Sequence, residues 1–244
     1  MKKSIELKNI NKSFGKKQVL FDVSLSIPEG CIYGLLGPSG CGKTTSVKII
    51  AGILNQDSGE AIILGKPMPD LDLMRQIGYM AQSDALYATL SAYENLKFFG
   101  QLYSIDNKTL KNRIQYVMEL VNLTKDLMKP ISAYSGGMKR RLSLAIALLA
   151  NPKVLILDEP TVGIDPVLRN DIWKELYDLA NSGVTILITT HVMDEATKCN
   201  LLAMMWDGKV LITGSPQEIQ EQTGTNNIEE SFIYLEKSGD KNEN

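Results

Sequence analysis

The chain has 244 residues, a formal net charge of −2 and 44% hydrophobic residues, as expected of a globular protein with a substantial core. The small net charge argues against a nucleic-acid partner. Three scattered cysteines exclude a disulfide framework or a cysteine zinc site, and they suit a reducing cytoplasm. The first residues lack the apolar stretch of a signal peptide, and no run reaches the roughly 20 apolar residues that span a bilayer. We therefore expect the chain not to form a membrane path itself.

The first part of the chain has the pattern of antiparallel sheet. Apolar side chains alternate largely with polar ones over residues 19–27, which is the period of a half-buried strand, and Ile5 and Leu7 alternate similarly. We predict strands in both segments.

A glycine-rich turn follows the apolar run 32–36. After the turn, Val47, Ile50, Ala51 and Leu54 recur on one face, which predicts a helix. A strand, a glycine-rich turn and a helix start form the phosphate loop of nucleotide-binding proteins, whereas a chance glycine turn would lack these flanks. The candidate ATP-binding residues here are Gly37, Pro38, Ser39, Gly40, Cys41, Gly42, Lys43, Thr44 and Thr45.

The phosphate loop assigns a task to each polar side chain. Lys43 would contact the β- and γ-phosphates, and the Thr44 hydroxyl would be a ligand of Mg²⁺. Cys41 lies at the helix start, a position that favours thiolate, so we expect its alkylation to block ATP binding.

A helical segment is predicted over residues 84–133. Residues 91–94 read Ser-Ala-Tyr-Glu, a plausible capping box, and an apolar stripe follows from Leu110 to Val121. Further along, Asp165 and Pro166 read as the N-cap and first residue of another helix.

Two carboxylates follow the apolar run 154–157, which is typical of a buried parallel strand. Asp158 is best placed to approach Mg²⁺, and Glu159 to polarise the attacking water, since neighbouring strand side chains point to opposite faces. The alternative is a surface strand end with two solvated acids.

The only histidine, His191, follows the apolar run 185–188. The carboxyl ends of parallel strands share one edge of a sheet, so His191 is expected near Asp158 and the phosphate loop. After it, residues 206–209 predict a hairpin turn, and the polar residues 237–244 predict a disordered tail.

Together these motifs resemble the nucleotide-binding subunit of an ATP-binding cassette (ABC) transporter, over nearly the whole chain. The resemblance implies that Phe14 stacks on adenine, that Gln82 senses Mg²⁺ and the attacking water, and that His191 contacts the γ-phosphate. Gln82, Glu159 and His191 are then the catalytic residues, with Thr44, Gln82 and Asp158 at Mg²⁺. Ser135, Gly136 and Gly137 match the family signature, which binds the partner's ATP, and Asp165 lies in the loop that crosses the dimer interface.

The signature departs from the family pattern at two positions. Tyr134 replaces the usual leucine, and Met138 the usual glutamine. Lys139, Arg140 and Arg141 then place cations in the first turns of a helix, where they oppose the helix dipole. Such cations favour a nearby anion, and a solvated basic face is the alternative.

The resemblance implies an α/β P-loop NTPase (RecA-like) core with a small antiparallel β-subdomain and a helical subdomain insertion. We expect one domain over residues 1–236, with the core and β-subdomain at about 1–83 and 134–220 and the helical subdomain at about 84–133. Two such domains would pair head to tail, as a homodimer or with a paralogue, and would hold ATP between them.

The amino-acid sequence of three segments, residues 135–142, 161–166 and 228–235, resembles that of cassettes of bacterial drug, antibiotic and lipid exporters. We therefore expect an ATP-hydrolysing subunit that powers export through a separate permease. It would lie on the cytoplasmic face of the membrane, and a groove at residues 84–93 would bind the permease. An importer cassette, a soluble switch acting on ribosomes or DNA, and a non-hydrolytic binding module are the alternatives.

Overall fold

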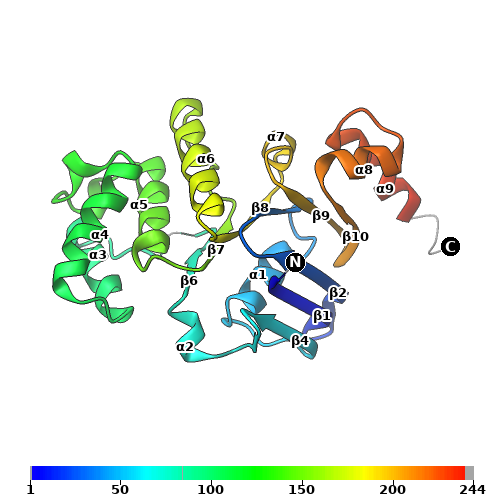
Figure 1. Cartoon of the computed structure of the whole chain (residues 1–244), viewed down its shortest axis with the longest axis horizontal. Helices are drawn as coiled ribbons and strands as arrows, with labels where there is room; N and C mark the ends of the chain where they lie inside the picture. The colour runs from blue at the N-terminus through cyan, green and yellow to red at the C-terminus, as the bar shows by residue number, and fades with distance from the viewer. Residues whose placement is uncertain (1, 84, 240–244) are drawn as a thin grey trace.

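The computed structural model describes residues 2–83 and 85–239, and it forms an α/β fold with two sheets (Figure 1). The smaller sheet has four antiparallel strands in the order β2-β1-β4-β5. Its strands are β1 (Lys3–Phe14), β2 (Lys17–Pro28), β4 (Ser58–Ile63) and β5 (Lys66–Pro67). The alternating patterns around Ile5 and over residues 19–27 are thus confirmed as paired antiparallel strands.

The larger sheet has six strands in the order β10-β9-β3-β8-β7-β6. All neighbours are parallel except β10, which forms an antiparallel hairpin with β9 at the predicted turn. Its strands are β3 (Ile32–Leu36), β6 (Ile77–Met80), β7 (Val154–Asp158), β8 (Thr185–Thr190), β9 (Leu201–Trp206) and β10 (Lys209–Gly214).

This larger sheet separates two hydrophobic cores. Along β7, Leu155 and Leu157 belong to one core, while Val154 and Ile156 belong to the other. Successive strand side chains point to opposite faces, so a continuous apolar run is what a doubly covered strand requires. One core includes the helices α3 to α9, and the other includes α1 and the small sheet.

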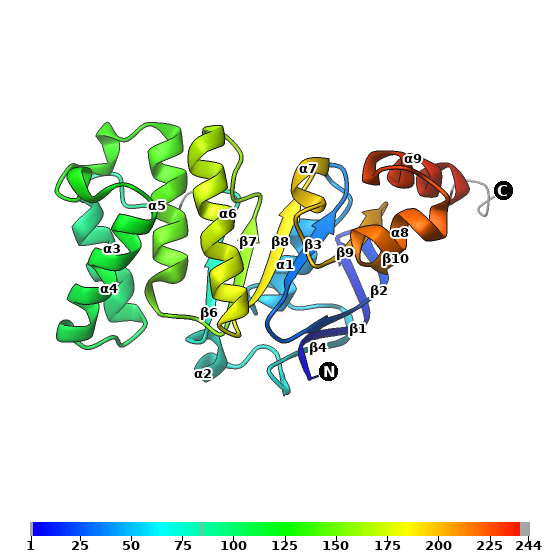
Figure 2. The same ribbon diagram turned by 45° about the horizontal axis from the view of Figure 1, so that its top comes forward.

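The helices gather in separate groups (Figure 2). Helices α3, α4 and α5 pack together at one end of the molecule, and α8 and α9 pack together at the other. The helices are α1 (Lys43–Ile50), α2 (Leu71–Met74), α3 (Ala92–Leu102), α4 (Asn107–Leu120), α5 (Gly136–Leu149), α6 (Pro166–Asn181), α7 (Met193–Ala196), α8 (Pro216–Thr223) and α9 (Ile228–Gly239), with single 3₁₀ turns at Thr124–Asp126 and Ile131–Ala133.

Several helix ends can be compared with the sequence predictions. The capping box at Ser91 is present, and Asp165 caps α6 by accepting a hydrogen bond from Leu168 N–H at 3.0 Å. Helix α1 is shorter than predicted, because Gly52 adopts a φ of 73° just after it and Leu54 lies beyond its end.

The polar C-terminal segment also differs from its prediction. Helix α9 continues to Gly239, so residues 237–239 are helical rather than disordered, and residues 240–244 lie outside the described part of the chain. Within the described residues, no helix is both long and apolar enough to cross a bilayer.

Candidate functional site

The phosphate loop joins β3 to α1 and borders a cavity of about 310 Å³. The residues that line this cavity come from the loop, the small sheet and the ends of β6 and β7: Phe14, Val19, Ser39, Gly40, Gly42, Lys43, Thr44, Thr45, Gln82 and Glu159. Nine of these residues are candidates from the sequence, and Val19 is the addition. We call it the nucleotide cavity.

The start of α1 presents backbone N–H groups to this cavity. Helix α1 has Gly42 as its N-cap and no side-chain capping bond, so its first N–H groups remain available to an anion. Gly40 has a φ of 84°, a conformation that glycine adopts readily, and a Cβ there would meet nothing within 4 Å. Lys43 Nζ donates to the carbonyls of Gly37 at 2.7 Å and Pro38 at 2.9 Å, and so lies against the loop itself.

Two predicted ATP-binding residues, Gly37 and Cys41, do not line the cavity and instead pack against the protein interior. A Cβ on Gly37 would lie 2.4 Å from the Met205 carbonyl, so only glycine fits there. Cys41 is only 4% exposed, and burial raises the pKa of its thiol, although Lys43 opposes this. The expectation of a reactive thiolate at Cys41 is therefore wrong: desolvation outweighs the helix start.

The two carboxylates at the end of β7 diverge. Asp158 is fully buried, and one of its oxygens, Oδ1, accepts a hydrogen bond from the Thr189 hydroxyl. Its Oδ2 has no hydrogen-bond partner among the described residues. Glu159 lies after the strand with a φ of 54°, so a left-handed backbone turn, rather than strand alternation alone, directs the second carboxylate elsewhere.

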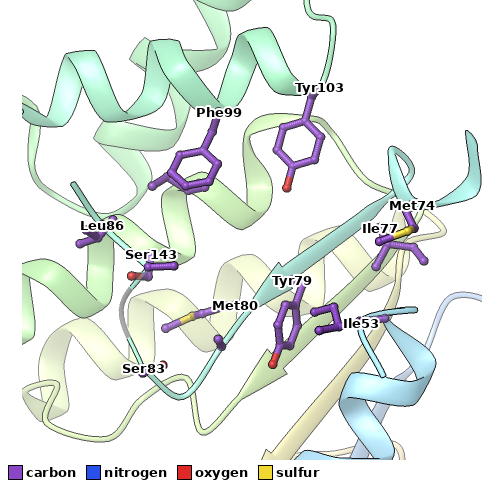
Figure 3. Close-up of a pocket in the computed structure, with 14 residues that line it drawn as sticks. Ile53, Met74, Ile77, Tyr79, Met80, Ser83, Leu86, Phe99, Tyr103 and Ser143 are labelled. Carbon is purple, nitrogen blue, oxygen red and sulfur yellow. The ribbon is translucent and has the colours of Figure 1, made fainter. Parts of the chain in front are cut away.

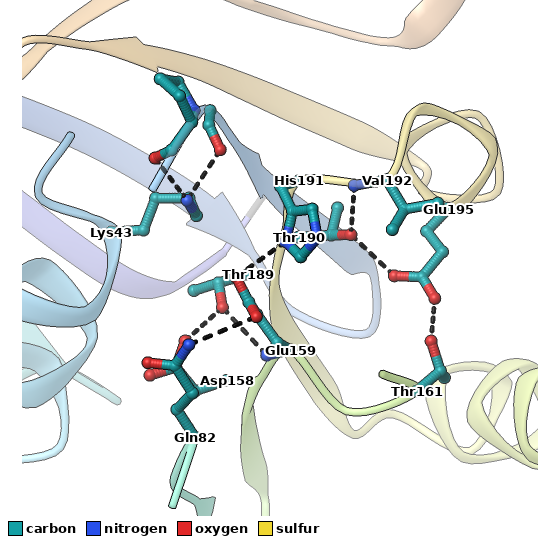
Figure 4. A network of polar contacts seen from close by, with 12 residues as sticks. Lys43, Gln82, Asp158, Glu159, Thr161, Thr189, Thr190, His191, Val192 and Glu195 are labelled. Carbon is teal, nitrogen blue, oxygen red and sulfur yellow. Dashed lines mark hydrogen bonds and ion pairs between the residues drawn. The ribbon is translucent and has the colours of Figure 1, made fainter. Parts of the chain in front are cut away.

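Three catalytic candidates meet at this edge of the sheet (Figure 4). Glu159 Oε1 lies 2.9 Å from His191 Nδ1, and Gln82 Nε2 donates to Glu159 Oε2 at 3.4 Å. The residues follow β8, β7 and β6, which are neighbours in the sheet. His191 thus lies at the sheet edge where Asp158 ends β7, as predicted, and the structure adds its contact with Glu159, with Gln82 beside them.

A buried glutamate that the sequence analysis missed supports this group. Glu195 accepts hydrogen bonds from the hydroxyls of Thr161 and Thr190, the latter at 2.7 Å. Thr190 Oγ1 also accepts from Val192 N–H at 2.9 Å, so the network holds the backbone on both sides of His191 (Figure 4). An acid four positions after the only histidine was the available signal.

The environment of Arg140 differs from the one expected for the basic cluster after the signature. Arg140 is 7% exposed, and its guanidinium donates to the carbonyls of Ala81, Gln82, Asp158 and Glu159. Arg141 donates instead to the carbonyls of Val121 and Asn122. Both guanidiniums bind backbone oxygens of their own chain, and for the buried Arg140 these contacts replace the expected anion or solvent.

The signature residues lie away from the nucleotide cavity of their own chain. Ser135 caps α5 by accepting from Met138 N–H at 3.3 Å, and neither Ser135 nor the two glycines lines the cavity. Tyr134, which replaces the usual leucine, is buried and donates to the Asp126 carbonyl at 2.8 Å. A Cβ on Gly137 would lie 3.3 Å from the Gly163 carbonyl, so the signature adjoins the loop before Asp165.

The donor set at the cavity suits Mg²⁺, which prefers oxygen ligands and keeps part of its coordination for water and phosphate. Thr44 and Gln82 line the cavity, and Asp158 at the edge of the sheet has a buried oxygen without a protein partner. No group of three His, Cys, Asp or Glu residues in the described ranges could hold a metal by itself.

A second hollow lies between β6, α3 and α5 (Figure 3). It has a volume of about 430 Å³, and its lining comes from the end of α1, the β6 strand and its flanks, α3 and α5: Ala51, Ile53, Met74, Ile77, Tyr79, Met80, Ala81, Ser83, Ala85, Leu86, Phe99, Tyr103, Ser143 and Ile146. We call it the apolar groove. Ala81 and Ser83 line the groove, while Gln82 between them lines the nucleotide cavity.

Sequence comparison places the chain among transport proteins. It is 40% identical over 230 residues to the Nod factor export ATP-binding protein I of Sinorhizobium fredii, covering 93% of this chain and 67% of that protein. It is 40% identical over 236 residues to ABC transporter G family member 20 of Dictyostelium discoideum, and 34% identical over 244 residues to the probable multidrug ABC transporter ATP-binding protein YbhF of Escherichia coli. These matches cover 96% and 97% of this chain but only 32% and 42% of those longer relatives.

Solved structures agree with the sequence comparison. An ATP-binding subunit of an ABC transporter superposes with a TM-score of 0.89 at 26% identity, covering 95% of this chain and 99% of that one. The dimeric bacterial ABC transporter cassette MJ0796 superposes with a TM-score of 0.80 at 27% identity, covering 86% and 98%. The predicted P-loop NTPase fold is thereby confirmed. The ABC transporter profile matches residues 20–162, and the chain belongs to the ABC transporter family as an ATP-binding domain.

Proposed function

We propose that this chain is the ATP-hydrolysing subunit of an exporter and works with a separate membrane permease. The observation that carries the proposal is the meeting of Gln82, Glu159 and His191 beside the phosphate loop. Such a set has the groups needed to hold a γ-phosphate and orient a water, and a module that only bound nucleotide would not need it.

ATP would bind with adenine against Phe14 and the phosphates in the loop. Phe14 is half-exposed at the end of β1 and lines the nucleotide cavity, so one ring face can receive a base. The N–H groups at the start of α1 and the Lys43 ammonium would bind the phosphates.

Glu159 would then accept the proton of the attacking water, while Gln82 and His191 orient that water and the γ-phosphate. The His191 contact at 2.9 Å orients the Glu159 carboxylate, and a general base has to be oriented toward the proton that it accepts. Bound Mg²⁺, held by Thr44, Gln82 and Asp158, would neutralise charge that develops on the phosphate oxygens.

The position of the signature supports pairing of two cassettes. Ser135, Gly136 and Gly137 are at least partly exposed and do not line their own nucleotide cavity, so their donors are free for a nucleotide on another chain. The relative MJ0796 was solved as a dimer. Each ATP would thus lie between the phosphate loop of one subunit and the signature of the other, with Asp165 near the contact.

The apolar groove would receive the permease at the cytoplasmic face of the membrane. Of the predicted segment 84–93, Ala85 and Leu86 line the groove, and Asp84 is outside the described residues. The remaining lining comes from β6, α3, α5 and the end of α1, so the groove is wider than the sequence suggested. Its occupant would touch residues on both sides of Gln82, and so could affect the nucleotide cavity.

Export is favoured over import because two of the relatives named above carry export or multidrug names. The test is to tag the chain in its native host, solubilise membranes gently and identify what co-purifies. A multispanning protein in near-equal amount supports the proposal, and its family identifies the direction of transport. Recovery only with ribosomal or DNA-bound partners would replace the transporter assignment by a soluble switch.

A further inference from the structure

Arg140 lies at a junction of three segments that the proposed mechanism uses separately. It is on α5, five residues after Ser135, so it is part of the helix that begins with the signature. Nη1 donates to the carbonyl oxygens of Ala81 at 2.7 Å and Gln82 at 2.9 Å. Nη2 donates to those of Asp158 and, at 2.6 Å, Glu159.

The four acceptors belong to the backbone that carries the side chains of Gln82 and Glu159. Ala81 and Gln82 follow β6, and Asp158 and Glu159 end or follow β7, which pairs with β6 in parallel. The ladder between these strands ends at the pair Met80 and Leu157. Past this pair, the guanidinium bridges the two backbones at the point where Gln82 Nε2 reaches Glu159 Oε2.

The backbone at Glu159 requires such support. A non-glycine residue with a φ of 54° occupies a region that L-residues seldom adopt, and surrounding contacts must hold it there. The Glu159 N–H donates to the carbonyl and the hydroxyl of Thr189, each at 3.1 Å. The Glu159 carbonyl accepts from Arg140 at 2.6 Å and from Val162 N–H at 3.5 Å, so the residue is held at both ends of its backbone and α5 supplies the shortest of these contacts.

We propose that Arg140 is a positioning residue that links the signature helix to the Gln82–Glu159 pair of the same chain. The inference rests on the proposed function, in which Ser135, Gly136 and Gly137 bind ATP held by the partner. Engagement of the partner's ATP then changes the position of α5, and Arg140 transmits that change to the water-activating pair in its own chain. Each subunit thereby reports the occupancy of one ATP site to the other.

The chemistry requires arginine. A guanidinium is planar and carries donors on both terminal nitrogens, so it can hold four carbonyls of two segments at once, whereas an ammonium is a single point charge. Lysine at position 140 keeps the charge and loses the bridge. Arg141→Lys is the matched control, because Arg141 is the next residue of α5 and its guanidinium binds the carbonyls of Val121 and Asn122, away from the Gln82–Glu159 pair.

The first experiment compares Arg140→Lys, Arg140→Gln and Arg141→Lys for ATP turnover, ATP affinity and melting temperature. We expect both Arg140 variants to lower kcat about 10- to 100-fold, the cost of misplacing catalytic groups by a fraction of an ångström to an ångström. KM, ATP affinity and melting temperature should stay close to those of Arg141→Lys. Equal kcat in all three variants would overturn the inference, as would a loss of kcat that only follows a loss of stability.

The second experiment decides in which chain Arg140 acts. Mixed dimers are made in which one subunit carries Glu159→Gln, so that only the other subunit hydrolyses ATP. Arg140→Lys in the hydrolysing subunit should lower the rate about 10- to 100-fold, and in the Glu159→Gln subunit much less. The reverse order would mean that Arg140 serves only the signature in trans, and would overturn the inference.

A control separates this inference from the proposed function. The Glu159→Gln protein should form an ATP-dependent dimer by size-exclusion chromatography. Absence of that dimer would overturn the proposed pairing and the inference with it. A normal dimer whose Arg140→Lys form turns over at the rate of Arg141→Lys would overturn the inference alone.

Discussion

The nucleotide cavity and the apolar groove lie on opposite sides of one short segment, and they are built by different means. The cavity is lined mostly by backbone donors, hydroxyls and charged groups at the sheet edge, while the groove is lined mostly by aliphatic and aromatic side chains of several elements. Polar recognition needs positioned donors, whereas apolar docking needs only area and shape. Changes to one hollow should therefore leave the function of the other intact, apart from what passes through residues 81–83.

Glu159→Gln should have the largest effect, confined to the cavity. Losing a positioned general base lowers kcat by about 10²- to 10⁴-fold, while the amide retains the shape needed for ATP binding. Steady-state phosphate release and nucleotide binding measure the two parts. Glu60→Gln, in an exposed carboxylate on β4, is the control. Turnover near wild type would remove Glu159 from the mechanism.

Lys43→Met should come next, because it removes the charge but retains an unbranched side chain. Hydrogen bonds from a charged group contribute about 1.5–3 kcal/mol, so ATP affinity should fall about 10- to 150-fold. Titration calorimetry measures the change, and Lys48→Met tests a cation on the exposed face of the same helix. Equal affinity in both variants would contradict the assignment of Lys43 to the phosphates.

Ile53→Glu should affect the groove and spare the cavity. Ile53 is 55% exposed and lines the groove, so a charge there is tolerated in the free chain but has to be desolvated beneath a partner. We expect about tenfold less permease in the co-purification described above. Leu102→Glu changes a 60% exposed side chain of α3 outside the groove and is the control. Equal capture by both variants would exclude the groove as the docking site.

Alkylation of Cys41 tests whether this buried residue of the phosphate loop is shielded from solvent, and the expected effect is smaller. Burial raises the pKa of this thiol, so less thiolate forms at neutral pH, and the sulfur is also shielded. We expect iodoacetamide to modify Cys41 at least about tenfold more slowly than in the unfolded chain, with the rate still rising above about pH 9. Peptide mass spectrometry measures this. Fast modification at pH 7 would restore the thiolate interpretation.

Tyr134→Phe should have the smallest effect. It removes the hydroxyl that donates to the Asp126 carbonyl, a contact that contributes about 1 kcal/mol to the free energy of unfolding. Burial raises the pKa of Tyr134 to about 12, so above about pH 10 the unfolded chain loses this proton before the folded chain does, and stability falls. Thermal unfolding at pH 7 and pH 10.5 should show the difference between the two proteins shrinking at the higher pH. A difference that grows would contradict this account.

The sequence by itself determined the local elements with strong physical signatures. A glycine-rich turn between an apolar run and a helical pattern predicts a phosphate loop. The alternation over 19–27, the capping box at Ser91 and the cap at Asp165 required no distant contact. These features depend on backbone conformation and on neighbours a few residues away, so the chain order contains the necessary information. The shared edge of β7 and β8 also followed from chain order, because parallel strands end together.

Only the tertiary structure decided how side chains from distant segments are used. Desolvation beneath the loop suppresses the thiolate that a helix start favours at Cys41. Four carbonyls from the ends of β6 and β7 bind the guanidinium of Arg140, which the sequence had assigned to an anion or to solvent. Burial and hydrogen bonding between segments far apart in the chain determine both outcomes, and neither leaves a periodic or local signal in the sequence.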